Sequence, residues 1–210
     1  YAAGLLPESG RAFTVSRNEI LAWDVASAEE QFRFGTGNPS GHAATIWSLA
    51  VSPDQEMLAS GDAAGRVLLW TVDGELLREL GGATNRVNAL VFSADGAHLL
   101  AASDDGQTIR WEVDTGRILT IYSGGQGAVT SVDIDPDSLR VLTGHSNGLA
   151  RLWTIDGTLL QTLEGHEGPI NAVAFSPASR AQALTASDDG TARQWNLNTG
   201  GHVRTFTGHE

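Results

Sequence analysis

The sequence has 210 residues, 41% of them hydrophobic, which is enough to bury the core of one compact domain. The formal net charge of −12 would repel a phosphate backbone, so we expect no nucleic-acid partner. Cysteine is absent, which excludes disulfides, thiolate metal sites and a cysteine nucleophile. No apolar run approaches the roughly 18 residues of a membrane helix, so we expect no direct insertion into a membrane.

These features favour a soluble protein, with a cytoplasmic location preferred over a periplasmic one. The 13 basic residues are all arginine. Together with abundant alanine and glycine, this bias is typical of a bacterial genome, and we assign it no role in binding.

A unit of about 42 residues recurs along the chain. Five tryptophans, at positions 23, 70, 111, 153 and 195, mark its period. Upstream of the last four lie short alternating apolar runs that end in turn formers: IWSLAVSPD, VNALVFSADG, VTSVDIDPD and INAVAFSPAS. Alternation at period two, broken at Ser-Pro-Asp or Asp-Gly, predicts β-strands and no helices. The sixth tryptophan, Trp47, lies outside this spacing.

The fourth interval shows how one unit folds. Residues 128–134, 139–145, 149–155 and 158–164 each read as one strand, joined to the next by a tight turn. A four-stranded antiparallel unit of about 40 to 45 residues that repeats radially is a propeller blade. We therefore predict an all-β fold, a β-propeller with five visible blade repeats.

Several dipeptides recur among the units with defects: Gly82-Ala83 and Gly124-Gly125, for example, stand where other units have Gly-His. Gly-His precedes the apolar strand at residues 41–42, 165–166 and 208–209, Asp-Gly follows it, and a tryptophan ends the unit. Only Trp23-Asp24 is an intact Trp-Asp ending. With these motifs the chain resembles the WD-repeat β-propeller family over essentially its full length.

The resemblance implies the blade boundaries and the size of the ring. We expect blades at 1–41 (with its start missing), 42–81, 82–124, 125–165 and 166–208, with 209–210 opening a further blade. Propellers of this family most often have seven blades, so we expect the chain to be part of a seven-bladed ring. A five-bladed ring is the alternative.

The resemblance also implies a buried hydrogen-bonded tetrad of His, Ser or Thr, Asp and Trp in each blade. The second blade has Asp62 as a possible substitute for the missing Asp, and the fourth has Asn147. A catalytic relay is the competing interpretation, but the same spacing recurs in degraded form and ends each time at a Trp, which favours a structural role. One complete set is present: His166, Thr185, Asp189 and Trp195. Partial sets are His42, Ser60 and Trp70; Asp105 and Trp111; Thr143 and Trp153; and Trp23 alone.

Other candidate chemistry is weaker. The pairs Asp104-Asp105 and Asp188-Asp189 fall in Ser-Asp-Asp-Gly segments typical of hairpin turns. The acidic segment 133–138 lacks the glycine and terminal glutamate of a calcium loop. His98, His145 and His202 share no metal-ligand spacing. We predict no catalytic residue, metal site or cofactor.

Three positions per repeat are implied to form the binding face. They are the residue before and the residue after the first apolar residue of the first strand, and the residue preceding the tetrad Asp. The first set is Thr45, Arg86, Ala128 and Pro169. The second set is Trp47, Asn88, Thr130 and Asn171. The third set is Ser16, Ala63, Asp104, Ser146 and Asp188.

Trp47 stands out within the second set because its equivalents are small and polar. It is therefore either an exposed binding residue, with Arg86 and Asn88 beside it, or a side chain wedged between blades. We predict a non-catalytic scaffold or sensor propeller that binds a protein or peptide on one face, as a domain or subunit of a larger assembly. The alternatives are the positioning domain of an enzyme or electron-transfer protein whose active domain lies elsewhere, and a purely structural subunit.

Overall fold

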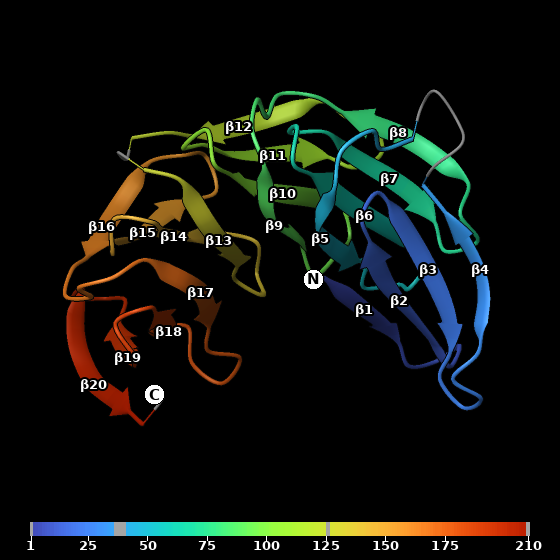
Figure 1. Cartoon of the computed structure of the whole chain (residues 1–210). Coiled ribbons are helices and arrows are strands. Elements are labelled where there is room, and N and C mark those ends of the chain that lie inside the picture. Colours follow the sequence, from blue (N-terminus) through green and yellow to red (C-terminus); the bar gives the residue numbers. More distant parts are fainter. Residues whose placement is uncertain (1, 36–40, 125–126, 209–210) are drawn as a thin grey trace.

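The computed structural model describes residues 2–35, 41–124 and 127–208. All regular elements in this part of the chain are β-strands, which form five four-stranded sheets. Each sheet is an antiparallel meander in which strands adjacent in sequence pair with each other (Figure 1). The prediction of an all-β fold built from four-stranded antiparallel blades is confirmed.

Every blade contributes four consecutive strands. Blade 1 contains β1 (Ala3–Leu6), β2 (Arg11–Ser16), β3 (Glu19–Asp24) and β4 (Glu30–Phe34). Blade 2 contains β5 (Ile46–Val51), β6 (Met57–Asp62), β7 (Val67–Thr71) and β8 (Leu76–Leu80). Blade 3 contains β9 (Val87–Phe92), β10 (His98–Ser103), β11 (Thr108–Glu112) and β12 (Ile118–Tyr122). Blade 4 contains β13 (Val129–Ile134), β14 (Arg140–His145), β15 (Ala150–Thr154) and β16 (Leu159–Leu163). Blade 5 contains β17 (Ile170–Phe175), β18 (Gln182–Ser187), β19 (Thr191–Asn196) and β20 (Gly201–Thr207).

The first blade has all four strands, although β1 has 4 residues where β5, β9, β13 and β17 have 6. Residues 209–210, which we predicted to open a further blade, lie outside the described residues. In the fourth blade each strand begins and ends within one residue of the predicted range.

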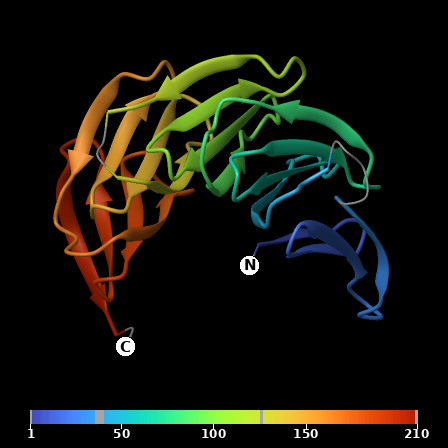
Figure 2. The ribbon, with the colours of Figure 1, turned by 45° about the horizontal axis from the view of Figure 1, so that its top comes forward.

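The blades are arranged side by side along an arc, with β1, β5, β9, β13 and β17 on the inside and β4, β8, β12, β16 and β20 on the outside (Figures 1 and 2). In blades 2, 3 and 4 the second and third strands are largely buried on both faces, because a neighbouring blade covers each side.

The hydrophobic cores lie between blades. Each of the four clusters of buried side chains combines residues of two consecutive blades. Aromatic residues at the end of an outer strand reach across to the tryptophan of the next blade: the ring centroids are 5.4 Å apart for Phe34 and Trp70 and 6.0 Å apart for Tyr122 and Trp153. Successive blades therefore stabilise each other, and a single blade would have no core of its own.

The face of blade 5 that points away from blade 4, called here its outer side, is uncovered. Leu184 is 46% exposed, whereas its equivalents in blades 3 and 4, Leu100 and Leu142, are fully buried. Phe206 is 42% exposed, whereas its equivalent Tyr122 is 2% exposed against blade 4. Blade 5 thus presents to solvent the kind of surface that the other blades pack against a neighbour.

Candidate functional site

Backbone hydrogen bonds bring together two of the predicted binding positions in each of four blades. The amide of the residue that precedes the tetrad position donates to the carbonyl oxygen of the residue that precedes the first strand. The pairs are Ala63 to Thr45 (2.8 Å), Asp104 to Arg86 (2.9 Å), Ser146 to Ala128 (3.0 Å) and Asp188 to Pro169 (2.9 Å). This repeated bond places the two loops side by side at one end of every blade.

Trp47 lies at this end of blade 2, one residue into β5. Its side chain is 44% exposed, and the guanidinium carbon of Arg86 in the next blade lies 4.8 Å from the centre of its ring. At this distance a cation over an indole face is attracted by the ring quadrupole. Four of the five tryptophans that end the repeats are at most 4% exposed, and Trp23 is half-buried, so the structure separates Trp47 from them.

Arg86 is held in place from two sides. Its Nε donates to Asn88 Oδ1 at 2.8 Å and forms an ion pair with Asp104 at 3.1 Å. Asn88 Nδ2 donates to Asp104 Oδ1 at 2.7 Å. The structure therefore joins four of the predicted binding residues, Trp47, Arg86, Asn88 and Asp104, into one group that spans blades 2 and 3.

In blades 3 and 4 the residue equivalent to Trp47 forms a hydrogen bond to the next blade. Asn88 Nδ2 donates to the Val129 carbonyl of the next blade at 2.8 Å, and Thr130 Oγ1 donates to the Ile170 carbonyl of the blade after that. An indole at position 47 makes no such bond. The adjacent Ser48 instead donates to the Val87 carbonyl at 3.0 Å. Sequence analysis missed Ser48, whose only signal was a hydroxyl within an otherwise apolar strand.

In blade 5 the corresponding residue, Asn171, donates to Asp188 of its own blade. Thr130 and Asn171 lie at the same end of their blades as Trp47, at the second position of β13 and β17. Within the described residues, no hydrogen bond or ion pair joins their side chains to Trp47, Arg86, Asn88 or Asp104. The predicted binding residues form a row along the inner edge rather than a single cluster.

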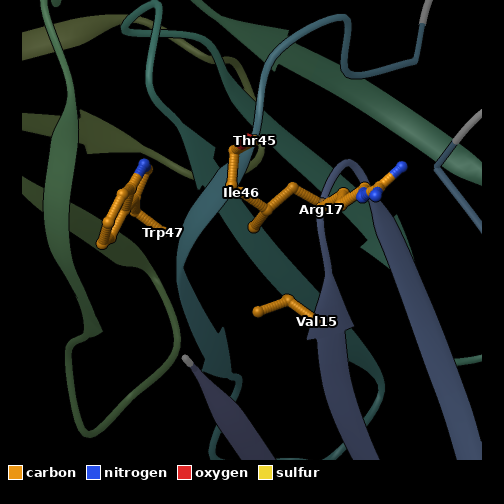
Figure 3. Close-up of a pocket in the computed structure, with 5 residues that line it drawn as sticks. All are labelled: Val15, Arg17, Thr45, Ile46 and Trp47. Atoms are coloured by element: carbon orange, nitrogen blue, oxygen red, sulfur yellow. The ribbon is translucent and has the colours of Figure 1, made fainter.

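A pocket of about 280 Å³ adjoins Trp47. Its lining residues come from blades 1 and 2 and are Val15, Arg17, Thr45, Ile46 and Trp47. Figure 3 shows the Trp47 ring on one side of β5 and the Val15 and Arg17 side chains on the other, so the lining residues come from both sides of this strand. Val15 and Arg17 were not predicted, because their approach to β5 depends on the packing of blade 1 against blade 2.

The predicted tetrad residues of blade 5 lie within hydrogen-bonding distance of one another. His166 Nδ1 is 2.7 Å from Asp189 Oδ2, His166 Nε2 is 2.7 Å from Thr185 Oγ1, and Trp195 Nε1 donates to Thr185 at 2.8 Å. Burial opposes ionisation of Asp189, but hydrogen bonds from Thr191, His166 and two backbone amides outweigh it and hold its pKa well below the usual range.

Blade 2 has a second complete network, in which Asp62 replaces the carboxylate missing at Ala64. His42 Nδ1 lies 2.8 Å from Asp62, His42 Nε2 lies 2.6 Å from Ser60, and Trp70 donates to Ser60 at 2.8 Å. The sequence predicted a complete network in blade 5 alone, whereas blades 2 and 5 both have one. Asp62 comes two residues earlier in the chain, from the end of β6, and its carboxylate still reaches the imidazole.

In blade 4 the histidine comes from the same strand as the hydroxyl. Trp153 donates to Thr143 at 3.0 Å, and Nε2 of His145, which lies two residues further along β14, is 2.9 Å from the same hydroxyl. Burial, followed by the nearby charge of Arg151, lowers the pKa of His145 to about 4. His145 was not predicted to belong to this network. Its separation of two residues from Thr143 was the available signal, because such residues share a strand face.

In blades 1 and 3 the hydrogen-bonded networks that begin at the tryptophan are shorter. Trp23 donates to Thr14 at 2.7 Å, so blade 1 retains a hydroxyl that the sequence comparison had missed. Trp111 donates to the Gly81 carbonyl at 2.9 Å, because Ala101 of blade 3 has no hydroxyl to offer. Asp105 accepts from the Thr84 amide at 2.8 Å and thus ties the loop before β9 to the β10–β11 turn.

The described residues contain no group of three or more His, Asp or Glu side chains positioned to hold a metal ion. In the same ranges of the chain, no helix has the length and apolar character needed to cross a membrane.

Comparison with known proteins identifies the repeats. The pattern of the family described as "WD domain, G-beta repeat" (WD40) matches residues 36–71, 74–112, 116–154 and 157–196, which is more than half of the chain. The chain belongs to the WD-repeat family. Each match ends one residue after a repeat tryptophan. The match at 74–112, for example, joins β8 of blade 2 to three strands of blade 3, so the sequence repeat spans two blades.

Similar proteins are longer than this chain. The guanine nucleotide-binding protein subunit beta of Oryza sativa subsp. japonica is 29% identical over 202 residues, which cover 90% of this chain and 51% of that protein. The SIR4-interacting protein SIF2 of Saccharomyces cerevisiae is 27% identical over 199 residues, with 87% and 37% covered. The chain thus spans about half the length of the first relative. These relatives are from a plant and a yeast, and the bacterial origin stays a prediction.

Proposed function

We propose that this chain is a non-catalytic protein-interaction domain that binds a protein or peptide at the end of the blades where their inner strands begin. The observation that carries the proposal is the exposed Trp47 ring beneath Arg86, held on a rigid edge. Tryptophan and arginine are the side chains that most often anchor interfaces. We assign the contacting positions to Thr45, Trp47, Arg86, Asn88, Asp104, Thr130, Asn171 and Asp188.

Two further observations support a protein partner. One relative is named as a subunit of a guanine nucleotide-binding protein, and another is named as a SIR4-interacting protein. The net charge of −12 disfavours a nucleic-acid partner, because a phosphate backbone carries one negative charge per nucleotide, more than a peptide with one or two carboxylates. The alternative of a purely structural subunit accounts less well for an exposed tryptophan where the other blades have small polar side chains.

The proposal of a non-catalytic domain is supported by the burial of the tetrad hydroxyls. Ser60, Thr143 and Thr185 are buried, and each accepts a bond from a tryptophan N–H. A nucleophile must be accessible to its substrate beside a group that stabilises the oxyanion. A positioning role for an enzyme or electron-transfer protein would require a domain other than this one.

We further propose that the arc is part of a larger ring, with seven blades as the expected number. The uncovered side of blade 5 supports this, because its exposed Leu184 and Phe206 match residues that are buried between blades elsewhere in the arc. A sixth blade of the usual kind would cover both side chains. Measuring the mass of the native protein tests this proposal.

Trp47→Ala tests the binding face. We expect capture of protein partners from a lysate of the source cells to fall at least tenfold, with the melting temperature nearly unchanged, because an exposed anchor contributes to affinity more than to folding. Quantitative mass spectrometry of the captured proteins provides the measurement. Leu160→Ala, at a similarly exposed residue of the outer strand β16, is the control and should capture as the parent does. A lower melting temperature with unchanged capture would show that Trp47 serves only to pack blade 2 against blade 3.

A further inference from the structure

We propose that the pocket beside Trp47 binds an acidic peptide segment, with an apolar side chain of the peptide in the pocket and an adjacent carboxylate on Arg17. This inference rests on the proposed function and specifies the chemistry of the partner. It combines three observations: the size and lining of the pocket, the state of Arg17 and the state of Arg86.

The size of the pocket fits peptide side chains. Sites for small ligands and cofactors usually enclose about 300 to 1,000 Å³. This pocket encloses about 280 Å³, and three of its lining residues, Val15, Ile46 and Trp47, are apolar. One apolar side chain of an extended peptide, with part of its backbone, matches a space of this size and would cover part of the exposed indole.

Arg17 is a free cation at the edge of the pocket. Its side chain is exposed and has no hydrogen bond, ion pair or ring contact with any residue that the structure describes. In the same part of the chain, Arg11, Arg33 and Arg66 are each paired with a carboxylate. Arg17 combines an exposed side chain with a guanidinium that pairs with no described residue, and it therefore offers a bidentate site for a carboxylate.

The backbone at Arg17 is fixed next to the pocket. The carbonyl of Arg17 accepts a hydrogen bond from the Ile46 amide at 2.6 Å, which ties the β2–β3 turn to the start of β5. Figure 3 shows the Arg17 guanidinium pointing away from Trp47. A partner that meets both residues must therefore extend across β5, as a peptide segment does and a small anion does not.

Arg86 does not compete for the same carboxylate. Its guanidinium already pairs with Asp104 and lies over the Trp47 ring. Its charge is therefore largely neutralised, and it fixes the far side of the indole. The two arginines have different roles: Arg86 positions Trp47, and Arg17 is available to select an acidic partner.

A random heptapeptide library displayed on phage tests the proposal on the whole chain. We expect the selected peptides to be enriched in Asp or Glu next to Leu, Ile, Val or Phe. The most enriched peptide, made synthetically with a fluorescent label, should bind at least tenfold more weakly when its acidic residues are changed to amides. Arg17→Glu should weaken its binding at least tenfold, and raising the salt concentration should weaken it as well.

Arg117→Glu, in the exposed β11–β12 turn, makes the same charge change away from the pocket and should leave affinity within twofold. Enrichment of basic or uncharged peptides that still require Trp47, or equal binding by Arg17→Glu, would overturn the acidic specificity and leave the proposed function standing. No enrichment at all, or selected peptides that bind Trp47→Ala and Arg17→Glu as well as the parent, would overturn both. Displacement of the peptide by a short oligodeoxynucleotide would show that the site selects phosphate, which also contradicts the proposal.

Discussion

At the scale of single residues, the buried polar networks decide how the blades respond to acid. His145 is buried, and its Nδ1 has no hydrogen-bond partner among the described residues. Its pKa, lowered from 6.5 to about 4, means that it stays neutral in the folded protein under mildly acidic conditions. Asp62 and Asp189 differ in that hydrogen bonds hold their pKa values below the usual range, so both remain ionised.

We expect His145 to make the protein less stable as the pH falls. Between pH 6.5 and about 4 the unfolded chain binds a proton at His145 that the folded chain does not, so the free energy of unfolding decreases across this window. The full loss is on the order of 3 kcal/mol. Urea denaturation at pH 7 and pH 4.5 measures it.

His145→Gln is the matched control, because its amide can still meet the Thr143 hydroxyl but does not titrate. We expect a flatter dependence of stability on pH in this variant. If the parent and the variant lose stability equally between pH 7 and 4.5, another group is responsible. The two depressed carboxylates destabilise the fold only at lower pH, as each is protonated below its ordinary pKa.

At the scale of elements, the blades are joined by close approach of their inner strands. The side chain at the second position of β9 or β13 bonds to the first carbonyl of the next blade, as Asn88 and Thr130 show. Where β14 passes blade 5, Gly144 leaves room for Ile170 and Val173. A tight blade interface thus depends on a missing side chain as well as on hydrogen bonds.

Gly144→Ala should destabilise the fold by about 1 to 3 kcal/mol through overpacking. An added Cβ would lie 2.5 Å from Ser131 Oγ and 2.7 Å from Ile170 Cγ2, so strands of two blades would have to shift. Gly81→Ala is the control, since a Cβ there meets nothing within 4 Å. Chemical denaturation measures the free energy of unfolding of both variants. Equal values would show that the strands at the interface of blades 4 and 5 can shift to accommodate the added Cβ at little cost.

At the scale of the whole molecule, the cores between blades leave the outer side of blade 5 without a neighbour. Leu184 and Phe206 are exposed there, and Val203 accompanies them on the outer strand β20. An apolar face next to an exposed strand edge is a surface for association. In the proposed ring it is covered by another blade, and in the 210-residue chain alone it is open to a second molecule.

We expect the 210-residue chain produced alone to self-associate through this face. Leu184→Glu should shift the mass measured by sedimentation velocity towards the monomer with little change in melting temperature, because the side chain is already accessible to water. Leu160→Glu adds the same charge on β16 and should leave the association unchanged. If Leu184→Glu leaves the mass measured by sedimentation velocity unchanged, the molecules associate through another surface.

The strands, the period and the blade architecture could be predicted from the sequence without coordinates. Alternation at period two and the regular turn formers are local signals. The residues identified as the first apolar residue of each inner strand, Ile46, Val87, Val129 and Ile170, are the residues at which β5, β9, β13 and β17 begin. The tryptophan spacing revealed the repeat because every blade needs the same buried anchor. These features depend on neighbours in the chain, so they can be read without coordinates.

The tertiary structure alone decided how the side chains of different blades meet. Asp62 completes the network of blade 2 and His145 enters that of blade 4 because side-chain direction, rather than alignment position, sets hydrogen-bonding distance. The stacking of Arg86 on Trp47 joins residues 39 positions apart, through the packing of two blades. The pocket with Arg17 likewise depends on how blade 1 packs against blade 2, and sequence periodicity does not encode contacts of this kind.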